Sequence, residues 1–295
     1  MLGHNGAIAA KHLRRQTIGA LNVGRIMPHI AFGNVTKEYL AGKRHTVAIA
    51  NFSLEIERGS FVSLVGPSGC GKSTILLMLA GLLEPSSGTI AIDGKLVAGP
   101  NERIGTVFQD PHLLPWHTVL RNVLFPVDLR RKNLREFEPQ ARELLKLTRI
   151  EGFAEHYPHE LSGGMRQRAS ICRALILNPD ILLMDEPFSA LDAMTREEMT
   201  YELQRIWSSY GKTVIFVTHS VREAVFLSDR IVVIGLNPNC IIHDVSVPLE
   251  RPRTAKMETQ TAFNLIVDEI RDSIVQGHKY AKTHNGAAIQ IAAEI

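Results

Sequence analysis

The sequence predicts an α/β fold built around a phosphate-binding loop. Residues 61–65 form a short apolar run that is typical of a buried parallel strand, and residues 75–81 are an apolar segment that ends in glycine, as helices often do. Between them lies a glycine-rich turn followed by Lys-Ser, which completes the phosphate-loop motif. Its residues are Gly66, Pro67, Ser68, Gly69, Cys70, Gly71, Lys72, Ser73 and Thr74.

The residue types in this loop suit a polyphosphate. Glycines let backbone N–H groups curl around an anion, and the helix that follows points its positive end at the same place. We expect Lys72 to reach the β- and γ-phosphates and the Ser73 hydroxyl to ligate Mg²⁺. A plain glycine-rich turn is the alternative, but the complete motif between a strand and a helix favours a nucleoside triphosphate site.

Composition excludes several classes of protein. With 295 residues, 45% of them hydrophobic, the chain can bury one sizeable core or two small ones. The net charge of +3 is too small to argue for a nucleic-acid partner. The 3 cysteines lie far apart without a Cys-x-x-Cys pair, which suits a reducing compartment and argues against a disulfide framework or a structural zinc site. No apolar window of about 18 uncharged residues predicts a membrane span.

Short strands flank the loop on both sides. Alternating segments at 30–35, 46–49 and 52–56 precede it, and strands at 89–92 and 104–108 follow it. Tyr39 falls in the predicted turn between the first two strands. Its ring could stack on adenine, or it could be an ordinary surface tyrosine.

Residues 112–174 change character. Apolar spacing predicts a short helix near 119–127 and an amphipathic one near 137–148, with four prolines punctuating the region, so we expect a small helical subdomain inserted in the core. It closes at Ser162, a natural N-cap for a helix over 165–175. Because Gly163 and Gly164 expose backbone N–H groups beside that cap, the segment is either a second anion site or only a capped helix start.

Polar side chains stand where other predicted strands end. Asp185 and Glu186 follow the apolar run 181–184, and we expect Asp185 to hold Mg²⁺ through its water shell and Glu186 to accept a proton from the attacking water. Pro187 biases Glu186 away from helical geometry. Gln109 follows the strand at 104–108 and could touch Mg²⁺ or the attacking water, and His219 follows the strand at 214–217, where it could contact the γ-phosphate.

Taken in order, these motifs resemble the nucleotide-binding subunit of ATP-binding cassette transporters over about residues 29–245. The specific part is the segment Leu-Ser-Gly-Gly at 161–164, which other phosphate-loop enzymes lack. The segments 109–116 and 161–168 are similar to the ATPases of nitrate, sulfonate and taurine importers. Met165 departs from the glutamine that many cassettes carry, but this importer branch often has it.

The resemblance implies a P-loop NTPase (RecA-like) core with an antiparallel β subdomain and an inserted helical subdomain at about 111–174. This domain would span 29–247, between a mobile basic extension (1–28) and a C-terminal tail (248–295) with one weak amphipathic helix. Asp192, in the Ser-Ala-Leu-Asp turn that precedes a helix over 193–210, would join the nucleotide-binding residues. The implied cofactors are ATP and Mg²⁺, and the implied location is the cytoplasmic face of the cell membrane, peripherally bound.

The implied partners follow from the single copy of each motif. A segment at the tip of a separate subdomain cannot easily reach its own phosphate loop, so Ser162, Gly163 and Gly164 would cap the γ-phosphate held by a second ATP-binding subunit. The resemblance also implies separate permease subunits and, indirectly, a solute-binding protein, with no nucleic acid. We expect residues 112–119 either to contact the permease or to pack internally.

The function that the resemblance implies is that of the ATP-hydrolysing subunit of an importer for a small anionic solute such as nitrate, a sulfonate or taurine. A soluble cassette ATPase of DNA repair or translation, and an importer of a different small solute, stay open as alternatives. A P-loop kinase is a further alternative, against which the Leu-Ser-Gly-Gly segment and His219 argue.

Overall fold

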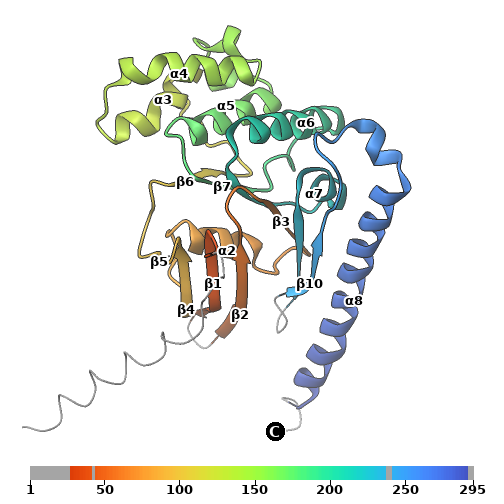
Figure 1. The fold of residues 1–295 in the computed structure, drawn as a ribbon. Helices are drawn as coiled ribbons and strands as arrows, with labels where there is room; N and C mark the ends of the chain where they lie inside the picture. The colour runs from red at the N-terminus through yellow and green to blue at the C-terminus, as the bar shows by residue number, and fades with distance from the viewer. Residues whose placement is uncertain (1–26, 42–43, 237–240, 292–295) are drawn as a thin grey trace, which may run out of the picture.

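The computed structural model describes residues 27–41, 44–236 and 241–291. Within these ranges the strands form a six-stranded sheet of order β10-β9-β3-β8-β7-β6 and a four-stranded sheet of order β2-β1-β4-β5 (Figure 1). The larger sheet holds β3 (Phe61–Val65), β6 (Ile104–Val107), β7 (Ile181–Asp185), β8 (Thr213–Val217), β9 (Arg230–Ile234) and β10 (Ile241–Ser246). The predicted α/β class is confirmed. The basic extension predicted at 1–28 lies almost wholly outside the described residues.

The strands of the larger sheet are apolar on both faces because both faces are covered. Neighbouring strands from β9 to β6 pair in parallel, and β10 joins the edge of β9 antiparallel. Successive side chains of a strand point to opposite faces, so Val62 and Leu64 of β3 belong to one buried cluster and Phe61 and Val65 to the other. Such continuous apolar runs are what a parallel sheet between two layers requires.

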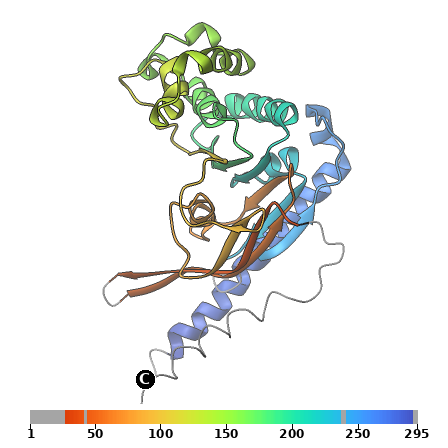
Figure 2. The ribbon, with the colours of Figure 1, turned by 60° about the vertical axis from the view of Figure 1, so that its left-hand side comes forward.

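The smaller sheet is antiparallel and covers α2 (Lys72–Leu79), which lies between the two sheets (Figure 1). It contains β1 (Ile30–Ala41), β2 (Arg44–Ile56), β4 (Ser87–Ile92) and β5 (Lys95–Leu96). Figure 2 shows the β1–β2 hairpin projecting from the body of the molecule. The prediction that Tyr39 sits in a turn is wrong: the residue lies in β1 opposite Thr46, because backbone pairing continues past the alternating residues to the end of both strands.

The region from 112 to 174 is helical, as predicted. It contains α3 (Val119–Leu129), α4 (Leu134–Leu147) and α5 (Gly163–Leu175), which lie together at one end of the molecule, with short turns η1 (Glu151–Phe153) and η2 (Pro158–Glu160) between α4 and α5 (Figure 1). α3 packs against both α4 and α5, and α5 also contacts β6. The apolar core of these helices is therefore continuous with that of the larger sheet.

The C-terminal part holds α6 (Ala193–Tyr210), α7 (Val221–Leu227), η3 (Ala255–Thr259) and α8 (Thr261–Ile291). The strand β10 is not predicted from the sequence, since only Val245 of its residues is buried and the apolar pattern is therefore weak. The helix α8 is longer than the weak helix predicted and includes most of the last residues, which were expected to be loose. Its first turns bury Phe263, Val267 and Ile270, and once a helix is anchored each added residue gains a hydrogen bond at low cost.

The segment that leads into α8 is fixed to the core by a buried arginine. The Arg253 side chain is 2% exposed, and its guanidinium donates to the carbonyl oxygens of Val225, Phe226, Ser228, Val247 and Leu249. The side-chain amide of Gln204 on α6 pairs with the backbone of Arg253 at 2.8 and 2.9 Å. In the described part of the chain, no helix is both long and apolar enough to cross a lipid bilayer.

Candidate functional site

Four segments predicted to bind or act on a nucleotide meet at one edge of the larger sheet. Because β3, β6, β7 and β8 run parallel, their carboxyl ends lie at the same edge. The phosphate loop follows β3, Gln109 follows β6, Asp185 ends β7 with Glu186 next to it, and His219 follows β8. The topology thus brings together the residues that the sequence singled out.

The phosphate loop needs glycine where it turns most tightly. Gly71 is the N-cap of α2 with a φ of 96°, and a Cβ added there would lie 2.2 Å from Cδ1 of Ile49 and 2.9 Å from the Ala48 carbonyl oxygen. A Cβ added to Gly66 would lie 2.2 Å from the Ile234 carbonyl oxygen. Gly71 also offers no side chain to cap α2, so the first N–H groups of that helix are available to an anion.

The Lys72 ammonium group is held inside the loop. Its side chain donates hydrogen bonds of 2.8 Å to the carbonyl oxygens of Gly66 and Pro67, and its Nζ lies 3.7 Å from Sγ of Cys70. Lys72 is 5% exposed, so these partners satisfy a charge that is shielded from water. The cationic group is therefore already oriented toward the interior of the loop, where a phosphate would bind.

Asp185 and Ser73 fit the predicted Mg²⁺ site. Oδ1 of Asp185 is buried without a hydrogen-bond partner. Burial raises the pKa of the Asp185 carboxyl, while a hydrogen bond with the Ser73 side chain works against that shift. Gln109 lines a cavity together with Asp185. A hydroxyl, a carboxylate and an amide oxygen are suitable ligands for Mg²⁺, which commonly uses one or two carboxylates and completes its shell with water and phosphate oxygens.

Glu186 and His219 face each other across β7 and β8. Nδ1 of His219 lies 3.3 Å from Oε2 of Glu186, and the Glu186 backbone N–H donates to the Val217 carbonyl oxygen at 2.9 Å. Glu186 has a φ of 46°, so it avoids the right-handed helical region, as the following proline favours, but adopts a left-handed backbone. Such a conformation costs of order 1–3 kcal/mol for a non-glycine residue and is often found at functional sites. The predicted roles of both residues stay predictions.

The segment Ser162–Gly164 and the turn that ends at Asp192 lie side by side. Ser162 is the N-cap of α5 and Asp192 the N-cap of α6, as predicted, with side-chain oxygens that accept from backbone N–H groups at 3.3 and 3.0 Å. A Cβ added to Gly164 would lie 2.6 Å from Cγ2 of Thr195, in the first turn of α6. The sequence predicted both caps but not their contact, which depends on how α5 packs against α6.

Tyr39 is available for stacking. Its side chain is 43% exposed near the end of the β1–β2 hairpin, and Nζ of Lys37 lies 5.3 Å from the centre of its ring. The predicted contact with adenine stays a prediction.

The residues after β6 are tied to α5 by side chains that the sequence did not single out. Gln167 donates to the Phe108 carbonyl oxygen at 3.2 Å, and Arg173 donates to those of Pro111 and His112 at 2.5 and 2.8 Å. Partners some sixty positions apart leave no local pattern in a sequence, so only the fold reveals these contacts. Any shift of α5 would therefore move the segment that carries Gln109.

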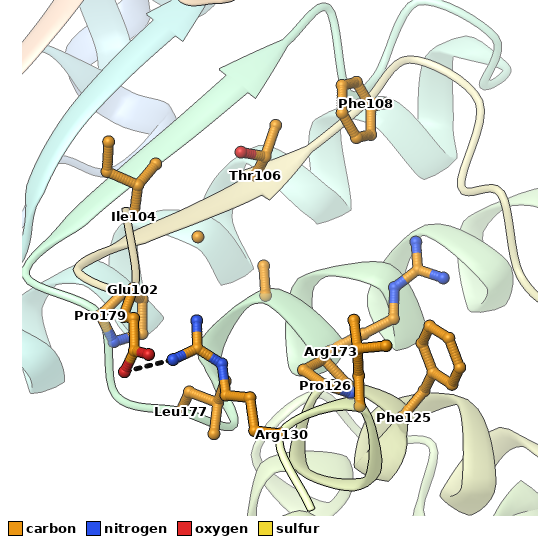
Figure 3. Close-up of a pocket in the computed structure, with 13 residues that line it drawn as sticks. Glu102, Ile104, Thr106, Phe108, Phe125, Pro126, Arg130, Arg173, Leu177 and Pro179 are labelled. Carbon is orange, nitrogen blue, oxygen red and sulfur yellow. Dashed lines mark ion pairs between the residues drawn. The ribbon is translucent and has the colours of Figure 1, made fainter. Parts of the chain in front are cut away.

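An apolar groove opens beside this connection, between α3, α5 and β6 (Figure 3). Side chains from α3 and from the strand side line it, with a Glu102–Arg130 ion pair at one end and Arg173 at the other. Its apolar lining includes Ile104, Phe108, Phe125, Pro126, Leu129 and Leu177.

Comparison with known sequences identifies close relatives. A family model described as ABC transporter matches residues 49–189. The chain is 44% identical over 246 residues to an uncharacterized ABC transporter ATP-binding protein of Methanocaldococcus jannaschii, covering 82% of this chain and 92% of the relative. It is 39% identical over 248 residues to the aliphatic sulfonates import ATP-binding protein SsuB of Bacillus cereus, covering 84% and 95%. It is 40% identical over 261 residues to the nitrate import ATP-binding protein NrtD of Synechocystis, covering 86% and 98%.

Two solved structures of similar chains are also ABC cassettes, in agreement with the sequence relatives. The ATP-binding cassette MJ0796, as a dimer in a post-hydrolysis state bound to ADP and phosphate, is 33% identical with a TM-score of 0.64, and the match covers 75% of this chain and 100% of that one. A second dimeric structure of MJ0796, described as a bacterial ABC transporter cassette, is 36% identical with a TM-score of 0.66 and the same coverage.

The variant Gly71→Ala is expected to lose nucleotide binding while keeping the fold. The added methyl group would collide with Ile49 and with the Ala48 carbonyl oxygen, and the left-handed backbone disfavours alanine, so the loop must open. We expect the dissociation constant of a fluorescent ATP analogue to rise at least about a hundredfold, the equivalent of about 2.7 kcal/mol. The matched control is Gly152→Ala, where a Cβ meets nothing within 4 Å. Equal affinity of the two variants would contradict this account of the loop.

Proposed function

The chain belongs to the ABC transporter family of ATP-binding proteins, and we propose that it is the ATP-hydrolysing subunit of an importer for a small anionic solute such as a sulfonate or nitrate. The observation that carries the solute class is the similarity, at 39% and 40% identity over more than four fifths of the chain, to relatives named for sulfonate and nitrate import. The chain is an ABC ATPase, and both alternatives share this reaction. A soluble cassette ATPase would differ from the proposal in its partner, and an importer of another solute would differ in its cargo.

The proposed reaction uses the residues at the edge of the larger sheet. Phosphate oxygens would replace the loop carbonyls as partners of Lys72, while the N–H groups at the start of α2 bind the same phosphates. Bound Mg²⁺, held by Ser73, Asp185 and Gln109, would neutralise charge on the β- and γ-phosphates. Glu186 would accept the proton of the attacking water, and His219 would hold the Glu186 carboxylate in position.

The completed site would need a second subunit. Ser162, Gly163 and Gly164 lie at the N-terminus of α5, and the phosphate loop leads into α2, on the other side of the larger sheet (Figure 1). We propose that the N-terminus of α5 caps the γ-phosphate bound by another copy, with the neighbouring Asp192 at the same interface. MJ0796 is dimeric in two solved structures, which supports a two-subunit arrangement by analogy. A donor supplied in trans lets ATP join two subunits and lets hydrolysis release them.

The groove beside α3 is the proposed docking site for a permease subunit. It lies next to the Gln109 segment, which Gln167 and Arg173 connect to α5, so an occupant of the groove could sense the nucleotide site. Trp116 is 69% exposed and its ring neighbours that of His117, which neighbours Phe125 at the groove. Of the residues 112–119, Trp116 is thus available for contact whereas Val119 is fully buried. This proposal implies a peripheral position at the cytoplasmic face of the membrane.

ATP is expected to drive dimerisation when hydrolysis is blocked. Glu186→Gln removes the proposed base and preserves the shape of the side chain, so the shared nucleotide should persist between two subunits. Sedimentation at micromolar protein should show a dimer with ATP and a monomer without it. The double variant Glu186→Gln with Ser162→Trp should stay monomeric, since an indole at the N-terminus of α5 would block the partner's phosphate. A monomer for Glu186→Gln with ATP would refute the shared site.

Docking in the groove predicts a separation of transport from ATP hydrolysis. Trp116→Ala and Leu129→Asn change exposed side chains, so folding and the basal ATPase rate of the isolated subunit should stay within about twofold of wild type. In proteoliposomes with the permease subunits, both variants should lose most of the solute uptake. The control is Leu265→Asn, which alters an exposed apolar residue on α8. Full uptake by both Trp116→Ala, next to the groove, and Leu129→Asn, in its lining, would place the docking surface elsewhere.

The proposed solute class predicts a nutritional phenotype. A strain that lacks this chain should fail to grow on an alkanesulfonate as sole sulfur source or on nitrate as sole nitrogen source, and should grow normally on sulfate with ammonium. The intact chain should restore growth and Glu186→Gln should not. If growth on both anions were unimpaired while the chain was an active ATPase in vitro, the proposed solute class would be wrong and the ATPase activity would still stand.

A further inference from the structure

Arg196 and Glu223 are charged side chains next to the turns that carry Glu186 and His219. Arg196, in the first turn of α6, donates to the carbonyl oxygens of Phe188 at 3.2 Å, Ser189 at 3.3 Å and Leu191 at 2.9 Å. These three carbonyls belong to the turn that leads from Glu186 to Asp192. One guanidinium group therefore binds three carbonyl oxygens of the turn by charge-assisted hydrogen bonds, whereas one backbone N–H could bind only one of them.

Glu223, in the first turn of α7, holds the neighbouring turn. Its Oε2 accepts a hydrogen bond of 2.8 Å from the hydroxyl of Thr218, and the same hydroxyl oxygen accepts one of 3.0 Å from the backbone N–H of Ser220. The Ser220 side chain in turn caps α7 by accepting from the Glu223 backbone N–H at 3.3 Å. His219 lies between these residues, so its backbone is fixed on both sides.

An ion pair joins the two turns. Nε of Arg196 lies 3.8 Å from Oε1 of Glu223, and the side chains are 31% and 11% exposed. Burial raises the pKa of the Glu223 carboxyl, and the hydrogen bond from Thr218 and the charge of Arg196 work against that shift. Both charges are thus partly removed from water and rely on each other and on the two turns for compensation.

The first turn also constrains Glu186. The backbone N–H and the hydroxyl of Ser189 both donate to the Glu186 carbonyl oxygen, at 3.2 and 2.9 Å. Glu186 carries the left-handed backbone described above, a conformation that persists only where its surroundings enforce it. Arg196 binds the Ser189 carbonyl, so its grip on the turn supports the conformation that points the Glu186 carboxylate at His219.

We propose that Arg196 and Glu223 are positioning residues of the ATPase site, which hold the Glu186 turn and the His219 turn at a fixed separation. Neither would touch the nucleotide. The inference rests on the proposed roles of Glu186 and His219 and adds the device that keeps them 3.3 Å apart. If the pair had a purely structural role, its removal would lower the stability of the fold without lowering kcat in preference to KM.

The kinetic test is a split between kcat and KM. Glu223→Gln keeps an acceptor for Thr218 and removes the charge that faces Arg196, and Arg196→Gln removes the grip on the turn. Each should lower the kcat of the full-length ATPase about tenfold to a hundredfold, the size expected from displacing a reacting group by about 1 Å. KM for ATP should stay within about twofold, because the phosphate loop is outside the network. The double variant should lose no more than the worse single one.

Matched variants separate positioning from packing. Glu197→Gln changes the adjacent carboxyl on α6, which accepts a hydrogen bond of 3.1 Å from the Tyr201 hydroxyl, and should keep the wild-type kcat. Thr218→Val should lose activity like Glu223→Gln, and Thr218→Ser, which retains the hydroxyl, should recover most of it. If Glu223→Gln proves too unstable to purify, the Thr218 pair decides the question by itself.

Hydrogen exchange gives a readout that needs no hydrolysis. In Glu223→Gln, peptides over 186–192 and 218–221 should exchange faster, and peptides over 66–79 should not change. Additive losses in the double variant, equal loss in Glu197→Gln, a changed KM with an unchanged kcat, or unaltered exchange in both turns would overturn the network. If the wild-type chain had no ATPase activity, the proposed reaction would be contradicted. The hydrogen-exchange result would still show whether Arg196 and Glu223 hold the two turns.

Discussion

The parallel pairing of β3, β8, β7 and β6 is the constraint on which the site depends. In a parallel sheet every strand ends at the same edge, so segments that are far apart in the sequence deliver their polar residues to one place. Lys72, Asp185 and His219 thus share an edge although 147 positions separate the first from the last. The apolar strands behind them are closed to water on both faces, so the edge is where charge meets solvent.

Lys72 and Asp185 differ in how their charges are satisfied at that edge. Lys72 is satisfied by two loop carbonyls, and Asp185 keeps one buried oxygen without a partner. A buried oxygen of this kind is costly unless something binds it, by roughly 1–3 kcal/mol for an unsatisfied group and more for a charged one. Oδ1 of Asp185 is therefore an acceptor that a cation could bind, and it lies next to a loop whose N–H groups and ammonium favour an anion. The two features together suit a phosphate that binds as a complex with a cation.

The sequence predicts local motifs correctly, but it does not predict contacts between distant elements. The phosphate loop, both helix caps at Ser162 and Asp192, and the strand ends at Asp185 and His219 depend on residues within a few positions of one another. Tyr39 was misassigned to a turn because pairing between β1 and β2 outlasts the alternation of apolar residues. The links from Gln167 and Arg173 to the segment after β6, and the ion pair between Arg196 and Glu223, depend on partners that only the packing of separate elements brings near. Sequence periodicity carries no signal for them.

The same distinction separates the residues proposed to act on the nucleotide from the residues proposed to hold them in place. A proton acceptor and a phosphate loop can be specified by short segments, since each is completed by its own strand and turn. Holding two such segments at a fixed separation requires side chains from other elements, and here α6 and α7 supply Arg196 and Glu223. α6 begins at the turn that also contacts the start of α5. A movement of α5 relative to the sheet would therefore reach Glu186 through one turn of backbone, and the Glu186–His219 pair would respond together with the Ser162 segment.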